Sequence, residues 1–344
     1  MSPEDHEAKL AQRPRDWVTI ETQLRSYAWH LLWRGLWGRI KQAWRGGVRL
    51  GPLLPLTGMA AGLAFQSLAA LAFALIPGIL IATLVFGLLG MRVLCFRTVF
   101  CGTTLLLVLV LGTITPLLGW ALAGLLGASG EERAWVALAS AAPVGTAALG
   151  GALALGFPAL VAAGAILASL IVAPLTLPFT AWLLGTEAGI EPGAMAQRLL
   201  LLIAVPVLLA SALRQVPFLA TLPRRRRCAE LALFALTLLA MSRMHNVRDT
   251  IAADPGLALH LLMLAFLPTL AGLLTVVLAL RRFGGMEAMI AGGFRNVALV
   301  WVATATLLPP EGHLFMALTA LPIYATPALV QILRRDRLPA SQSL

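Results

Sequence analysis

Long apolar stretches recur along most of the chain and determine what it can fold into. Of its 344 residues, 59% are hydrophobic and only 12% are charged. Stretches of roughly 18 or more apolar residues are long enough to cross a bilayer as helices. The sequence therefore predicts an all-α polytopic membrane protein. We place ten transmembrane helices near residues 50–66, 74–91, 98–126, 132–156, 158–184, 197–213, 228–244, 257–280, 286–308 and 313–333.

The basic residues lie mostly between these spans and indicate how the chain is oriented. With an even number of spans both termini share one side, and that side collects 21 of the 26 Lys and Arg residues. Four more fall on the opposite side, namely Arg133, Arg198, Arg243 and Arg248. Because cytoplasmic loops are rich in Lys and Arg, both termini are expected in the cytoplasm, with the chain in the inner (plasma) membrane. The net charge of +11 is thus interpreted as a topology signal, and no nucleic-acid partner is expected.

Residues 17–49 differ from the spans that follow. Five of the nine tryptophans lie here, and basic residues fill the gaps between apolar positions that recur at steps of three to five residues. This pattern is typical of a cationic amphipathic helix that lies in the membrane interface and contacts anionic lipid headgroups. The alternative is a polar linker that carries scattered tryptophans.

One charged residue interrupts an apolar stretch. Arg295 lies near the middle of the ninth span, after Gly292, Gly293 and Phe294 and before Asn296. Of the 41 Lys, Arg, Asp and Glu residues, it is the only one that we cannot place in a loop, a tail or a helix end. A charge at mid-bilayer costs on the order of 3 kcal/mol and needs a partner or a wet cavity. The glycines predict a discontinuous helix, of the kind whose freed backbone groups line a binding site in transporters.

Spans four and five resemble spans nine and ten. The segment Pro143–Leu149 lies mid-span, and a shift of 148 residues superposes Gly145 on Gly293 and Pro174 on Pro322. Five spans in each half place the halves in opposite orientation, which is the inverted-repeat design of secondary transporters. Coincidence between two apolar segments that contain Gly and Pro is the alternative. The expected organisation is a disordered tail at 1–16, the interfacial helix at 17–49, five-helix repeats at 50–185 and 195–334, and a tail at 335–344.

From about Leu53 to Leu333 the chain resembles the bile acid:sodium symporter family. The resemblance is clearest in residues 143–184, PVGTAALGGALALGFPALVAAGAILASLIVAPLTLPFTAWLL, which is similar to the family's P-x-G-T-A-S-N helix and the helix after it. Residues 292–296 lie where the family has an E-x-G-x-Q-N segment. The resemblance implies a 5+5 inverted repeat in which helices four and nine unwind and cross at the membrane centre. It also implies a substrate site beside the crossing and two sodium sites.

The positions that hold sodium in that family lack the necessary oxygen atoms here. They correspond to Ala148, Leu149, Ala162, Ile166, Ala291, Arg295 and a position near Leu111. Hard cations need several oxygen ligands, usually including a carboxylate. We therefore expect neither the sodium sites nor any other metal or cofactor.

These patterns favour a secondary transporter of a small organic anion. Arginine suits bidentate capture of carboxylate, sulfate or phosphate, and the N-termini of half-helices add positive dipoles. The residues expected to bind substrate are Arg295, Asn296, Thr146, Gly145 and Gly293. The residues expected to form the crossover are Pro143, Gly292 and Phe294. Three interpretations of Arg295 stay open: it contacts the substrate, it only caps carbonyls that the helix break frees, or the span end is misplaced and the residue lies outside the membrane.

Other function classes have less support. The sequence contains no HExxH, GxSxG or Walker motif, so an enzyme is not expected. The alternative function is a transport-inactive, carrier-derived scaffold that binds a membrane partner protein, since the lost ion sites and the cationic N-terminal segment also suit that role. His260, near the start of span eight, is left open between a proton site and an interfacial histidine. Residues 241–246 are expected to end span seven and form a loop.

Overall fold

The computed structural model describes residues 54–90, 101–146, 148, 159–184, 190–216, 222–279 and 286–326. This part of the chain is helical, apart from turns, short connections and one isolated β-bridge. The predicted interfacial helix at 17–49 and the predicted tails at 1–16 and 335–344 lie outside the described residues.

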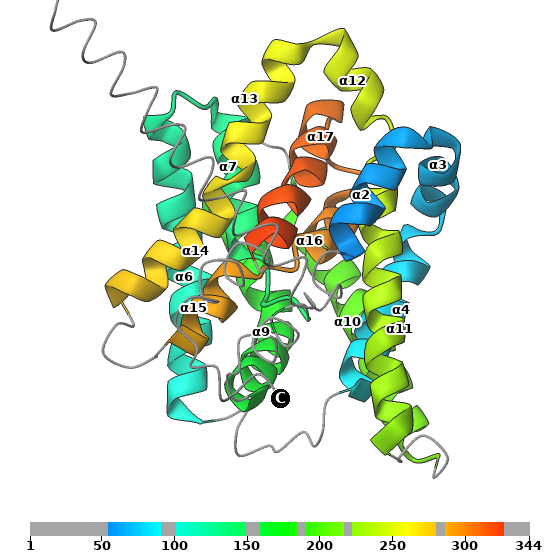
Figure 1. Ribbon diagram of the computed structural model, residues 1–344. Helices are drawn as coiled ribbons and strands as arrows, with labels where there is room; N and C mark the ends of the chain where they lie inside the picture. The colour runs from blue at the N-terminus through cyan, green and yellow to red at the C-terminus, as the bar shows by residue number, and fades with distance from the viewer. Residues whose placement is uncertain are drawn as a thin grey trace, which may run out of the picture. The chain divides into compact units, whose positions relative to one another are not determined.

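A first group of helices packs around α11 (Leu222–Ser242). It consists of α2 (Leu54–Ala64), α3 (Gln66–Ala74), α4 (Ile76–Gly90) and α10 (Pro192–Arg214). Helix α11 lies against α2, α3 and α4, and α10 packs on α4. The blue, cyan and yellow-green ribbons of α2, α3, α4 and α11 stand together on one side of the molecule (Figure 1).

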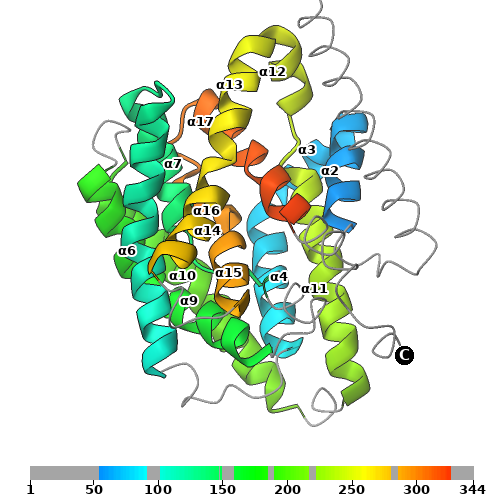
Figure 2. The same ribbon diagram turned by 60° about the vertical axis from the view of Figure 1, so that its left-hand side comes forward.

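A second group contains the remaining helices. It consists of α6 (Gly102–Leu125), α7 (Gly130–Ala141), α9 (Ala159–Leu184), α13 (Pro255–Ala265), α14 (Leu267–Ala279), α15 (Met286–Gly293), α16 (Val297–Thr304) and α17 (Pro310–Leu318). Helix α6 packs on α7, α9 and α14, while α15 packs on α9 and α14. The short helix α12 (Val247–Ala253) contacts α13 and α17. The two groups meet where α10 contacts α9 and α16, and where α4 contacts α16 (Figure 2).

Several helices are suited to a bilayer. Within the described residues, four helices are long and apolar enough to cross a membrane, and the bent pair α2 and α3 would make a fifth. Large apolar side chains also point outward, including Leu125 (82% exposed), Leu175 (74%) and Leu208 (68%). Helices that are apolar on all sides are typical of membrane spans, because lipid covers their outer faces. The chain is therefore an all-helical protein with several helices able to cross a membrane.

The predicted spans and the observed helices agree best for the long, uninterrupted stretches. Helices α4, α6, α9 and α10 coincide with predicted ranges to within a few residues at each end. The ninth predicted span is divided into α15 and α16, and the fourth is interrupted after α7. The ten-helix inverted repeat as a whole stays a prediction.

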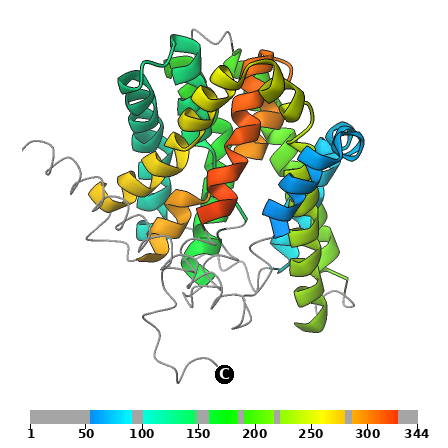
Figure 3. The same cartoon turned by 45° about the horizontal axis from the view of Figure 1, so that its top comes forward.

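The connection predicted after span one is in fact helical. Residues 66–74 form α3, which bends by 113° from α2 (Figure 3). Gln66 stabilises the bend, because its amide donates to the carbonyls of Gly62 (3.1 Å) and Met244 (3.3 Å) and its oxygen accepts from the backbone N–H of Asn246 (3.1 Å). The sequence predicted that the first span closes at Gln66, and a helix ends at Ala64, but a second helix that was not predicted begins at Gln66.

Candidate functional site

Two breaks in the helical chain pair with each other. Helix α7 ends at Ala141, α15 ends at Gly293, and the segments that follow form an antiparallel bridge between Val144 and Arg295. The N–H of Gly145 donates to the carbonyl of Phe294 (2.8 Å), and the N–H of Asn296 donates to the carbonyl of Pro143 (2.7 Å). Backbone groups that the breaks remove from helical pairing therefore satisfy one another, as a low-dielectric interior requires.

Neighbouring helices support this pairing. On α9, the hydroxyl of Ser169 accepts from the N–H of Val144 (3.0 Å) and donates to the carbonyl of Ile166 (3.0 Å). On the other side, α14 and α15 approach closely, since a Cβ on Gly292 would lie only 2.6 Å from the carbonyl oxygen of Gly272. Ser169 was not among the predicted site residues, although it is the only serine in the fifth predicted span.

Arg295 is buried at the pairing, with 4% of its surface exposed. Its Nη1 donates to the carbonyl of Ala142 (3.0 Å) in the first break, and its Nη2 donates to the carbonyl of Leu111 (3.3 Å) on α6. Leu111 precedes Pro116, a proline inside α6 that disturbs the preceding turn. The Nε atom is buried and has no hydrogen-bond partner in the described part of the chain. Both Nη groups thus cap carbonyls, while Nε lies on the α14 side, 3.5 Å from where a Cβ on Gly272 would be.

A small cleft reaches the paired breaks. Its floor includes Gly145, Thr146, Phe294, Arg295 and Asn296, and α4 and α11 form the facing wall. Asn296 begins α16 without a side-chain cap hydrogen bond, so its amide is not used to hold that helix end. The free volume is about 20 Å³, which holds about one water molecule.

A second arginine lines the same cleft and was not predicted as a site residue. Arg243 was expected where span seven ends and its loop begins, and it does lie in the turn after α11, but only 2% of its surface is exposed. Its Nη2 donates to the carbonyl of Met316 and to Oγ1 of Thr319 (2.8 Å). The turn after α11 brings the guanidinium to the C-terminal end of α17, where it caps the Met316 carbonyl. The signal was present, since Arg243 lies four residues after Leu239 and four before Val247, both of which are buried.

The surroundings of Arg243 are aromatic. Its Cζ lies 5.4 Å from the centre of the Trp301 ring, and the hydroxyl of Tyr324 interacts with its guanidinium. Tyr324 also lines the cleft. Among the described residues that line this cleft there are two arginines and no carboxylate.

The other predicted residues lie beside the cleft. Gly293 does not line it, and a Cβ there would contact Leu273 (3.3 Å) and Thr326 (3.8 Å), so this glycine serves packing. The positions that correspond to sodium ligands are apolar and buried at Leu111, Ala148, Ala162, Ile166 and Ala291. Leu149 lies outside the described residues. No group of three or more His, Cys, Asp or Glu side chains that could hold a metal occurs in the part of the chain described.

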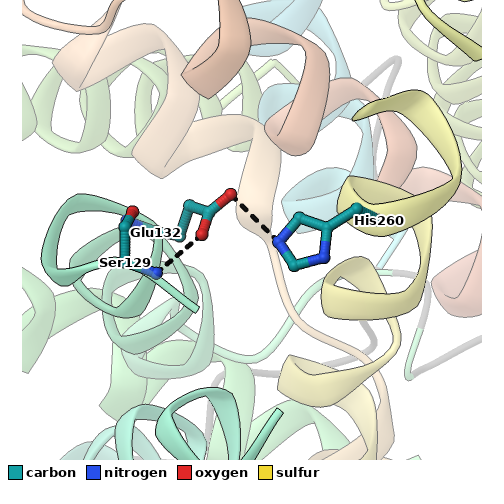
Figure 4. Close-up of polar contacts among 3 residues, drawn as sticks. All are labelled: Ser129, Glu132 and His260. Atoms are coloured by element: carbon teal, nitrogen blue, oxygen red, sulfur yellow. Dashed lines mark hydrogen bonds and ion pairs between the residues drawn. The ribbon is translucent and has the colours of Figure 1, made fainter. Parts of the chain in front are cut away.

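His260 lies away from the cleft. Its Nε2 is 3.1 Å from Oε1 of Glu132, and the contact joins α13 to the first turn of α7 (Figure 4). Glu132 also accepts from the N–H of Ser129 (2.7 Å) in a capping box. With His260 39% exposed and Glu132 16% exposed, this is a partly solvated contact between two helices of the second group.

A scan against protein-family models finds no match, and a search of curated proteins finds no similar sequence.

Proposed function

We propose that the chain is a secondary transporter of a small organic anion, built as a ten-helix inverted repeat of the bile acid:sodium symporter type. It lies in the plasma membrane with both termini in the cytoplasm. The observation that carries the proposal is the cleft beside the two paired breaks. Arg295 stands at its floor, and no carboxylate neutralises it among the described lining residues.

The chemistry of the cleft floor favours an anion. The guanidinium of Arg295 brings a positive charge to this lining, and its two hydrogen-bond acceptors are backbone carbonyls, not carboxylates. The side-chain amide of Asn296 and the hydroxyl of Thr146 border the same space and can donate as well. Hydrogen bonds from a guanidinium to a carboxylate are short and strong, and they would be strengthened further in a site shielded from water.

The position of the cleft favours transport over static binding. It lies between the α4 and α11 wall of the first group and the breaks of the second group. A space for about one water molecule cannot hold an organic anion, so the two groups must separate to admit one. Movement of one helix group against another around a central site is the principle of alternating access.

Arg295 also supports transport without sodium. Its guanidinium bridges the Ala142 carbonyl of the first break and the Leu111 carbonyl of α6. A fixed positive charge on carbonyl oxygens does there what a bound cation would do, and it cannot dissociate. The apolar, buried side chains at Ala148, Ala162 and Ala291 offer no oxygen ligands for a metal ion.

A carrier-derived scaffold is the second candidate. The observation that favours it is that both Nη groups of Arg295 already bond to backbone carbonyls in a cleft of about 20 Å³. In a scaffold the arginine would hold the breaks together, and the protein would bind a membrane partner without moving a solute.

Uptake into proteoliposomes separates these functions. Purified protein is first screened by thermal shift against a panel of carboxylates and sulfonates, because a ligand of the folded state raises the unfolding midpoint. Uptake of the best radiolabelled hit is then measured with and without a sodium gradient. We expect uptake that is independent of sodium and is lost in Arg295→Gln.

The matched control is Arg198→Gln. Arg198 also donates to a backbone carbonyl, that of Ala303 (3.4 Å), and to the hydroxyl of Thr306, but it does not line the cleft. Its variant should transport normally. Strong sodium dependence would refute the absence of sodium sites. Folded protein with neither anion binding nor uptake would leave the scaffold as the function.

A further inference from the structure

We infer that the substrate is a dianion with two separate acidic groups, one bound at Arg295 and the other at Arg243 and Tyr324. This inference rests on the proposed function and adds the class of anion. It follows from Arg243, which was predicted only as part of a span end and which lines the same cleft in the structure.

The guanidinium of Arg243 is fixed in orientation but keeps one donor without a partner in the described part of the chain. Its Nη2 is fixed by the carbonyl of Met316 and the hydroxyl of Thr319, so the guanidinium has a defined orientation. Its Nε is buried and has no acceptor among the described residues. Tyr324 adds a hydroxyl that interacts with the guanidinium and borders the cleft. The cleft lining therefore contains a second cationic side chain that is held in place and incompletely paired.

The two buried positive charges favour a ligand with two negative charges. Both guanidiniums are nearly fully buried, at 4% and 2% exposure for Arg295 and Arg243. Their protein partners are carbonyls, a threonine hydroxyl and a tyrosine, which are dipoles and not charges. Buried charges are stable only when they are paired, and an unpaired one is strongly destabilising. A monoanion would leave one guanidinium without a counter-charge, whereas a dianion neutralises both.

Apart from Thr83, Thr146 and Asn296, the rest of the cleft lining is largely apolar. It includes Leu80 of α4, Leu236 and Leu239 of α11, and Ala298 and Ile323. An apolar wall favours a hydrocarbon linker and penalises a polar one, because buried polar groups without partners are costly. The ligand class that fits is a short α,ω-dicarboxylate, or an organic acid with a second acidic group at its far end.

Matched ligand pairs test this inference. Dicarboxylates from malonate to adipate are titrated into the purified full-length protein alongside their monoamides, which have nearly the same size and one charge fewer. Binding is followed by isothermal titration calorimetry. Since loss of a hydrogen bond to a charged group weakens binding roughly 10- to 100-fold, at least one dicarboxylate should bind ~10-fold or more tightly than its monoamide.

Variants assign the second charge to Arg243. In Arg243→Gln, the dicarboxylate and its monoamide should bind with affinities within about threefold of each other, at the monoamide level of the wild type. Because Arg243→Gln removes a buried contact to Met316 and could unfold the protein, Tyr324→Phe provides a second variant with the charge intact. Tyr324→Phe should weaken binding of the dicarboxylate more than binding of the monoamide. Arg198→Gln is the control and should bind the dicarboxylate more tightly than the monoamide, to the same extent as the wild type.

The outcomes distinguish the inference from the proposed function. If monoamides bind as tightly as dicarboxylates and Arg295→Gln abolishes binding of both, the anion carrier stands and the dianion inference is wrong. If Arg243→Gln is folded and keeps the preference, Arg243 is not the second anchor and the inference is also wrong. If no anion of the series binds to the folded protein, both the inference and the proposed function fail.

Discussion

Gly292→Ala is expected to destabilise the protein, because the contact between α14 and α15 leaves no room for a methyl group. A Cβ at Gly292 would lie 2.6 Å from the carbonyl oxygen of Gly272 and 2.9 Å from Cγ2 of Val276. Ordinary contacts begin at 3.4 Å, so the two helices would have to separate by about 0.8 Å. Overpacking costs about 1–3 kcal/mol, and a clash with backbone, which cannot rotate away, falls at the upper end. The better helix propensity of alanine offsets at most about 1 kcal/mol.

The net loss of about 2 kcal/mol should appear as a lower unfolding midpoint, by a few degrees, in tryptophan fluorescence of the protein in lipid nanodiscs. Gly78→Ala is the matched control, since Gly78 lies in α4 and a Cβ there would meet nothing within 4 Å. Its midpoint should stay unchanged or rise, because alanine favours the helix. A Gly292→Ala protein as stable as Gly78→Ala would refute the close approach of α14 and α15.

Further substitutions test the hydrogen bond of Ser169 at the first break and the contact between Glu132 and His260. Ser169→Ala removes the acceptor of the buried N–H of Val144 and should cost about 1–3 kcal/mol in unfolding free energy, while Ser211→Ala, at an exposed site on α10, should have an effect within about 0.5 kcal/mol. Glu132→Gln keeps the capping box but loses the charge opposite His260, so it should lower the unfolding free energy by no more than about 1 kcal/mol. In a double-mutant cycle, His260→Ala should lower the unfolding free energy little further once Glu132 is replaced. Larger coupling would show that the pair is more than a partly solvated contact.

The sequence predicted the helical class and the paired segments well. Long apolar stretches leave few choices other than helices, because every backbone polar group in a bilayer must be satisfied within the chain. The glycines before Arg295 and the Pro-x-Gly segment at 143–145 marked the places where the helices stop. The expected contact between those segments is observed, since Gly145 and Asn296 donate across the bridge.

Sequence reasoning failed where a polar residue and a short helix lie at the end of a span. Arg243 follows α11 and precedes a polar sequence, so it looked like an ordinary loop cation. Only tertiary packing under α17 shows that its partner is the carbonyl of Met316. Helix α3 was missed for a related reason, because the residues between the first two predicted spans were taken as a connection and the contacts of Gln66 with Met244 and Asn246 are not visible in the sequence. In both cases the deciding interaction joins parts of the chain that are distant in sequence, and periodicity carries no information about it.

The charge of the cleft also predicts whether a carrier of this kind would favour exchange or net uptake. With Arg295 and Arg243 fixed in the protein, the empty cleft carries two positive charges, and a bound dianion neutralises them. Reorientation of the empty carrier would move uncompensated charge through a low-dielectric layer, which is costly, whereas the loaded carrier moves none. We therefore expect exchange of internal for external anion to exceed net uptake by roughly tenfold or more, which corresponds to a barrier difference of about 1.4 kcal/mol. The measurement compares uptake of a labelled dicarboxylate into proteoliposomes that are preloaded with the same anion or left empty. Equal rates would contradict the charge argument, and Arg243→Gln, which removes one of the two charges, should narrow the difference.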